Sequence, residues 1–110
     1  IVTGRPRSDA ARFLRRAGVD ALFDVLVCME DAPLKPDPGP VVLALRRLGV
    51  ERAWMVGDTP DDVRAARAAG VVSLGIVAPS DEPSVTSQRL FAAGAARVLD
   101  TLAQLEELLP

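Results

Sequence analysis

Residues 53–77 decide the fold and read AWMVGDTPDDVRAARAAGVVSLGIV. Two short apolar runs, Ala53 to Val56 and Val71 to Val77, enclose a segment that has Pro60 at a helix start and Gly70 at a helix end. Strands that are apolar on both faces and separated by a helix are typical of a parallel sheet covered on both sides. This stretch therefore predicts a strand-helix-strand unit of an α/β protein.

The same pattern at a helix end recurs along the chain. Basic residues near a helix end run into a glycine, which supplies the left-handed residue that closes the helix, and then into valine and an apolar run. The copies are Arg15-Arg16-Ala17-Gly18-Val19, Arg46-Arg47-Leu48-Gly49-Val50, Arg67-Ala68-Ala69-Gly70-Val71 and the weaker Ala93-Gly94-Ala95.

These patterns predict an alternation of strands and helices over the whole chain. The expected fold class is α/β, a Rossmann-like doubly wound parallel sheet, built as a single domain over residues 1–110. Four aromatic side chains lie on the predicted apolar faces, and most are expected in the core; they are Phe13, Phe23, Trp54 and Phe91. The predicted elements are a strand to Thr3, helix Pro6–Ala17, strand Leu22–Cys28, a helix to Leu48, strand Ala53–Val56, helix Pro60–Ala69, strand Val71–Val77, a surface loop Pro79–Pro83, a helix to Ala93, strand Ala96–Leu99 and a helix from Thr101.

Composition narrows the class of function. The net charge of −2 and the scattered arginines give no basic face for nucleic acid, and no apolar run reaches the ~20 residues of a membrane helix. Histidine is absent, which excludes Ser-His-Asp and Cys-His devices and histidine-rich zinc sites. Cys28 is the only cysteine, so it fits a small buried hydrophobe in a reducing cytoplasm. Any catalysis must use carboxylates, hydroxyls, lysine or arginine.

Candidate site residues follow the predicted strands, where ligands bind in open parallel sheets. Thr3 and Gly4 end the first strand, and a hydroxyl beside glycine can approach a phosphate oxygen. Lys35 is the only lysine and lies between prolines, which favours a need for a compact point charge. Asp58 follows an apolar strand and a glycine, as suits a magnesium ligand, and Asp62 lies in the next helix's first turn.

Thr3, Lys35, Asp58 and Asp62 match, in order and approximate spacing, positions of the haloacid dehalogenase superfamily, which the chain resembles over its whole length. The stretch Ala65 to Val71 looks like the phosphoglycolate-phosphatase-like subgroup. The family's first motif, an Asp-x-Asp that carries the nucleophile, is absent. Ile1-Val2-Thr3 looks like the last half of a strand, so we expect a segment upstream that would bear this motif and a substrate-selecting cap.

The resemblance implies a magnesium-dependent hydrolase that acts on a small phosphomonoester, a phosphorylated metabolite, through an aspartyl-phosphate. Asp58 and Asp62 would serve the metal, and Thr3, Gly4 and Lys35 the phosphate. The chain alone is expected to be inactive, and to self-associate through the sheet edges left by the missing central strand. Two alternatives remain, which are a response-regulator receiver domain and a non-catalytic fragment or regulatory subunit that keeps the scaffold.

Overall fold

The computed structural model describes residues 1–110 and contains a three-stranded parallel sheet. Its strands are β1 (Trp54–Gly57), β2 (Val72–Ile76) and β3 (Arg97–Leu99), in that spatial order. Trp54 lies opposite Val72, and the register continues to Gly57 opposite Gly75. The strands are adjacent in sequence and in space because each is joined to the next by one helix. The α/β class is confirmed.

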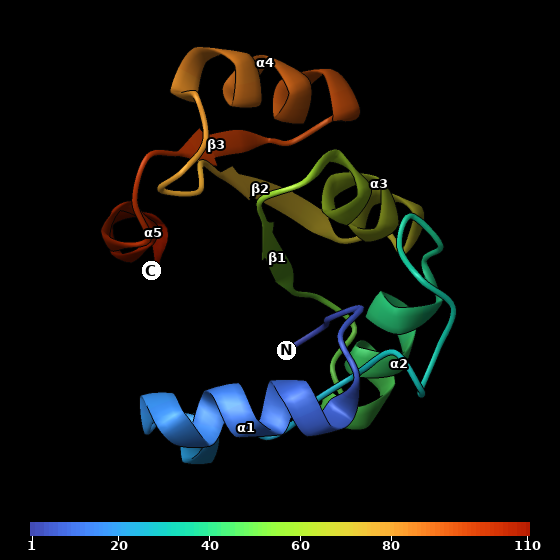
Figure 1. Cartoon of the computed structure of the whole chain (residues 1–110). Coiled ribbons are helices and arrows are strands. Elements are labelled where there is room, and N and C mark those ends of the chain that lie inside the picture. Colours follow the sequence, from blue (N-terminus) through green and yellow to red (C-terminus); the bar gives the residue numbers. More distant parts are fainter.

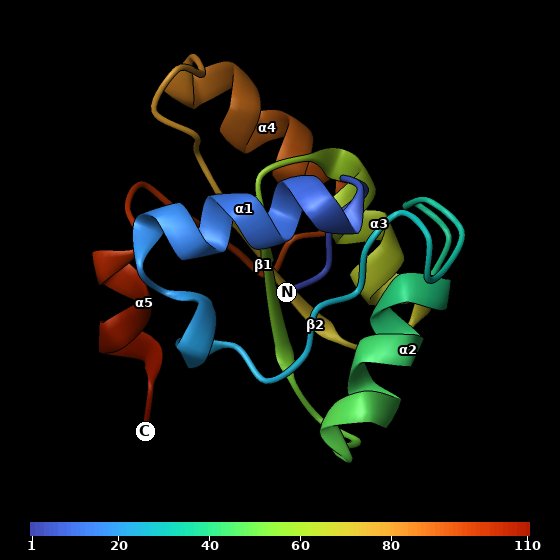
Figure 2. The same cartoon turned by 60° about the horizontal axis from the view of Figure 1, so that its bottom comes forward.

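Helices lie on both sides of this sheet, as Figure 1 and Figure 2 show, and the packing contacts with it come from α3 (Pro60–Ala68) and α4 (Pro83–Ala93). On one side α3 packs against β1 and β2, α4 packs against β2 and β3, and α2 (Gly39–Leu48) packs against α3. On the other side lie α1 (Arg7–Ala17) and the short α5 (Ala103–Leu108), and the turned view places α1 in front (Figure 2). The predicted helices are therefore present, and none of them is long and apolar enough to cross a membrane.

Buried small residues let these helices lie close to the sheet. Val63, Ala65 and Ala66 of α3 are fully buried, and Leu90 of α4 is fully buried against the same layer. Gly75 makes this possible, because an added Cβ there would lie 2.9 Å from the Leu90 side chain. The glycine stops also behave as expected, since the residues after α1, α2 and α4 adopt the left-handed conformation.

The predicted strand Leu22–Cys28 is largely wrong. Its first residue ends a 3₁₀ turn, Asp20–Leu22, and only Val27 forms a bridge, parallel to Val2. Hydrogen bonds from the Thr3 N–H to the Val27 carbonyl and from the Val27 N–H to the Ile1 carbonyl, both 2.9 Å, hold this short pair. The pair is separate from the three-stranded sheet, so neither of its members gains the length that a strand gains inside a sheet.

An apolar cavity of about 350 Å³ separates the pair from β1. Its twelve lining residues are all hydrophobic. They come from the N-terminus, the segment after η1 (Asp20–Leu22), α2, β1 and the start of β2, and are Ile1, Val2, Phe23, Val41, Ala44, Leu45, Leu48, Ala53, Trp54, Met55, Val56 and Val71. β1, an edge strand of the sheet, lines one side of this cavity.

The expectation that most of the aromatic side chains lie in the core is wrong. Phe13 is 70% exposed and Phe91 54%, and Phe23 and Trp54 are also nearly half exposed. Phe23 and Trp54 line the apolar cavity, and Phe13 lines a second hollow between α1 and the N-terminal residues. Their faces are apolar, as the sequence pattern indicates, but nothing in this structure covers them. Cys28, by contrast, is buried as expected.

Candidate active site

The centre of the candidate site is an ion pair between Lys35 and Asp62. The Lys35 ammonium lies 2.5 Å from Asp62 Oδ1 and donates to the Val2 carbonyl at 3.3 Å. Both side chains are shielded, with 18% of the lysine and 9% of the aspartate exposed. The pair therefore joins three segments that are far apart in sequence: the N-terminal strand end, the loop before α2 and the first turn of α3. Shielding strengthens such a pair relative to one in open water.

Asp62 also organises the turn between β1 and α3. Its Oδ2 accepts from the Asp58 and Thr59 N–H groups at 3.1 Å, while its own N–H donates to Thr59 Oγ1 at 3.2 Å. This is a capping box, which satisfies backbone donors at the helix start. Gly57 is required for the close approach, because an added Cβ would lie 2.3 Å from the Asp62 Cβ. Asp62 is thus committed to Lys35 and to the turn.

The charge state of Asp62 follows from these contacts. Burial by itself raises the pKa of this carboxyl, but the hydrogen bond and charge of Lys35, together with the Thr59 backbone and side chain, outweigh burial. The pKa of Asp62 therefore lies below its ordinary value, and the residue is a carboxylate at neutral pH.

Asp58 differs from Asp62 in being available. It is exposed at the end of β1, and its carboxylate makes no hydrogen bond and no ion pair. The structure contains no cluster of three or more aspartate, glutamate or cysteine side chains that could hold a metal ion by themselves. Within the candidate site, the Asp58 carboxylate is the one that is free to bind a cation. Magnesium commonly takes only one or two protein carboxylates and fills its other positions with water and phosphate oxygens. Asp58 fits that role, and the geometry favours Asp62 as its support rather than as a ligand.

Thr3 and Gly4 lie beside the Lys35 loop. Thr3 Oγ1 accepts from the Arg5 N–H at 3.2 Å, and its backbone N–H is bound to Val27. A Cβ on Gly4 would lie 3.3 Å from the Leu34 side chain, so glycine allows the strand end and the loop to meet. The Thr3 hydroxyl keeps a free proton to donate, as a phosphate oxygen requires.

The structure thus pairs Lys35 with Asp62, joins Asp62 to the Asp58 backbone, and places Thr3 and Gly4 in one small hollow with Lys35. Sequence reasoning did not find the Val2 carbonyl, which carries no side-chain signal. It also did not find Asp31, whose carboxylate joins Arg7 and Arg47 next to the Lys35 loop. A signal for it existed, because Arg7 lies in the first turn of a helix, where the dipole disfavours a cation without an acidic partner.

Several proteins are similar in sequence to this chain. The chain is 44% identical over its full length to part of an imidazoleglycerol-phosphate dehydratase from Phytophthora nicotianae, of which the match covers 27%. Pyrophosphatase PpaX from Bacillus velezensis is 43% identical over 69% of the chain and 37% of the relative. A phosphoglycolate phosphatase from Rhodospirillum rubrum is 43% identical over 64% of the chain and 31% of the relative. The chain therefore spans about a third of these proteins.

The chain also superposes on solved structures of haloacid dehalogenase-like hydrolases. A haloacid dehalogenase-like hydrolase from Bacteroides fragilis superposes with a TM-score of 0.81 at 32% identity, covering 93% of this chain and 48% of that one. A family hydrolase from Deinococcus radiodurans, solved with bound phosphate and sodium, superposes with a TM-score of 0.77 at 26% identity, covering 96% and 48%. The family model of the haloacid dehalogenase-like hydrolases matches residues 1–76. On this match, and with this fold and site, the chain belongs to the haloacid dehalogenase-like hydrolases.

Proposed function

We propose that this chain is the C-terminal part of a magnesium-dependent phosphatase that hydrolyses a small phosphomonoester, with its nucleophilic aspartate outside residues 1–110. The observation that carries the proposal is the shielded Lys35–Asp62 pair, which joins the loop that lines a small hollow with Thr3 to the turn that carries the free Asp58 carboxylate. A cytoplasmic location, which suits the single buried thiol, is part of the proposal. The relative named phosphoglycolate phosphatase supports this substrate class, and the relative named pyrophosphatase supports phosphoryl-group hydrolysis more generally.

The residues present divide the work of phosphoryl transfer. The Lys35 ammonium offsets the charge of the substrate phosphate, and the Thr3 hydroxyl donates to one of its oxygens. Asp62 holds the ammonium and the β1-α3 turn in place. The site carries two carboxylates and one cation, so a phosphate dianion would be repelled without more positive charge. A magnesium ion on Asp58 would supply that charge.

The nucleophile is proposed to arrive on the strand that fills the apolar cavity. Its carboxylate would attack phosphorus and displace the alcohol, forming an aspartyl-phosphate that water then hydrolyses. A strand inserted parallel to β1 would place its carboxyl end beside Thr3 and Asp58. The twelve apolar lining residues and the open strand edges on both sides support this placement.

The test is hydrolysis of p-nitrophenyl phosphate by two proteins, the 110-residue chain and the complete polypeptide that contains it. We expect turnover only by the complete polypeptide, and only with magnesium, so that chelation with EDTA stops it and added magnesium restores it. Enzyme-like turnover by the 110-residue chain would overturn the assignment of the nucleophile. No turnover by the complete polypeptide, over a panel of phosphomonoesters and pyrophosphate, would overturn the function.

A second candidate is a domain that keeps the scaffold inside a larger protein without its own activity. The observation that favours it is the full-length match to 27% of a protein named as a dehydratase. The same panel separates the two candidates, because a scaffold domain would leave every phosphoester intact. Imidazoleglycerol phosphate, which is itself a phosphomonoester, belongs in that panel.

The chain by itself is expected to self-associate. With no strand between them, β1 and the N-terminal pair carry unpaired backbone groups, and each of these that is buried costs about 1–3 kcal/mol. Total stabilities are only about 5–15 kcal/mol, so a few unpaired groups decide the outcome. Sedimentation should show oligomers or aggregates, with a broad thermal transition. A monomer with one sharp cooperative transition would show that the sheet is stable without another strand.

A further inference from the structure

A second charged cluster lies next to the site, centred on Asp31. Its Oδ2 accepts from the Cys28 N–H at 2.7 Å and pairs with the Arg7 guanidinium, and its Oδ1 lies 3.8 Å from Arg47. Only 16% of the Asp31 side chain is exposed, although both arginines are more than 40% exposed. The Cys28 N–H, followed by the two guanidinium groups, holds the pKa of Asp31 below its ordinary value against the effect of burial. Asp31 therefore links the turn at residues 28–31 to α1 and α2.

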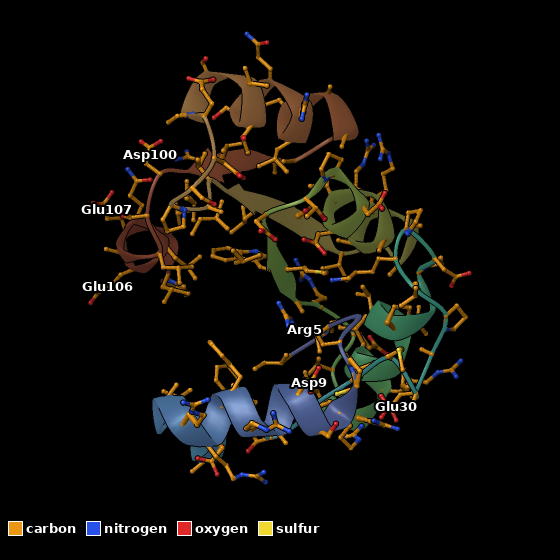
Figure 3. All side chains as sticks on the ribbon, in the orientation of Figure 1. Arg5, Asp9, Glu30, Asp100, Glu106 and Glu107 are labelled. Carbon is orange, nitrogen blue, oxygen red and sulfur yellow. The ribbon has the colours of Figure 1, made fainter.

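The same turn is held on its other side by backbone contacts. Arg7 also donates to the Leu26 carbonyl at 3.0 Å, and its backbone N–H donates to the Glu30 carboxylate at 2.9 Å. Figure 3 shows Glu30 beside the first turn of α1. The Met29 N–H donates to the Arg5 carbonyl at 3.0 Å, which is two residues beyond Thr3. The turn is thus fixed to the strand end that carries the Thr3 hydroxyl.

The path from Asp31 to Lys35 is short and stiff. Only three residues lie between them, and one is Pro33, whose ring restricts the backbone. The loop then contacts the Thr3 end through Leu34, which lies 3.3 Å from the Cβ position of Gly4. A shift of the turn would therefore be passed to Lys35, whose ammonium must reach both Asp62 and the Val2 carbonyl.

We propose that Asp31, held between Arg7 and Arg47, is a positioning residue that fixes the Lys35 ammonium at the phosphate site. The proposal rests on the proposed function, since it assigns Asp31 a part in the same reaction. Asp31 touches neither the substrate nor the metal and acts through Lys35. Removing the Asp31 charge does not alter the Lys35 side chain itself, but it releases the loop that positions the Lys35 ammonium.

The test is a double-mutant cycle in the complete polypeptide, with p-nitrophenyl phosphate and magnesium. We expect Asp31→Asn to lower kcat/KM about 10- to 100-fold, since a misplacement of about 1 Å in a catalytic group has effects of this size. In a Lys35→Met background the same change should lower kcat/KM by less than about 2-fold, because residues that act through one another are not additive. Asp31→Glu, which keeps the charge, should recover part of the loss.

Glu82→Gln is the matched control. Glu82 is also a carboxylate that accepts a backbone N–H, from Val85 at 2.7 Å, but it lies before α4, away from Lys35. It should leave kcat/KM unchanged in both backgrounds. If Asp31→Asn does not fold, as judged by its melting temperature, Arg47→Gln replaces it, with a smaller loss of the same pattern.

The outcomes separate the two proposals. Equal losses from Asp31→Asn with and without Lys35 would mean a structural role only and would overturn the positioning role. Normal activity of Asp31→Asn beside an inactive Lys35→Met variant would overturn it as well, and would leave the proposed function standing. Normal activity of Lys35→Met would overturn both.

Discussion

Asp58→Asn is expected to lower the phosphatase kcat of the complete polypeptide about 100-fold or more at ordinary magnesium concentrations, the size of loss seen when one group that stabilises transition-state charge is removed. The Asp58 carboxylate has no hydrogen-bond or ion-pair partner in the protein, whereas the Asp62 carboxylate is bound to Lys35 and to the β1-α3 turn. An amide binds magnesium more weakly than a carboxylate does, so raising the magnesium concentration should recover part of the activity. The measurement is kcat as a function of magnesium concentration.

Asp61→Asn is the matched control for that prediction. Asp61 lies three residues after Asp58, in the first turn of α3, but its carboxylate is 53% exposed and paired with Arg64 at 3.2 Å. Exposed pairs of this kind contribute little, so the control should keep its activity and its magnesium dependence. If Asp58→Asn behaved like Asp61→Asn, the acidic residues after β1 would be helix-capping residues only.

Lys35→Arg is expected to lower kcat/KM about 100-fold although the charge is kept, because small displacements of a catalytic group have effects of this order. The ammonium fits between Asp62 Oδ1 at 2.5 Å and the Val2 carbonyl at 3.3 Å, with 18% of the side chain exposed. A guanidinium is larger and planar and cannot occupy the same point. Thermal melts should show that the variant folds, and steady-state kinetics should show the loss.

The control is the reverse substitution, arginine to lysine, at an exposed position. Arg64→Lys changes an arginine that is 57% exposed and whose only ion pair is with Asp61, and it should leave kcat/KM unchanged. Wild-type kinetics for Lys35→Arg would mean that the position requires charge alone, and would remove the reason to distinguish this lysine from the twelve arginines of the chain.

Local signals in the sequence were sufficient for the helices and for one edge of the site. Thr59 and Pro60 announced the start of α3, and the glycines after α1 and α2 marked their ends, because capping and backbone conformation depend on a few neighbouring residues. Asp58 follows β1, as expected from the carboxyl end of a parallel strand, whereas Lys35 reaches Asp62 from a loop.

Features that depend on distant neighbours could not be predicted in this way. The strand expected over residues 22–28 is reduced to a bridge at Val27, and Phe23 and Trp54 are half exposed around an apolar cavity. An apolar pattern in the sequence indicates which face of an element would be buried, but it does not indicate whether another segment packs against that face. The role of Asp31 was missed because its partners, Arg7 and Arg47, lie on two different helices.

Trapping of the phosphorylated intermediate tests the central claim most directly. The complete polypeptide would be mixed with a phosphomonoester and magnesium and treated with borohydride, which reduces an aspartyl-phosphate to homoserine. The converted residue would then be located by mass spectrometry of peptides. We expect one homoserine, at an aspartate outside residues 1–110 that is followed two positions later by a second aspartate. Conversion of Asp58 or of any other aspartate within residues 1–110 would contradict the account.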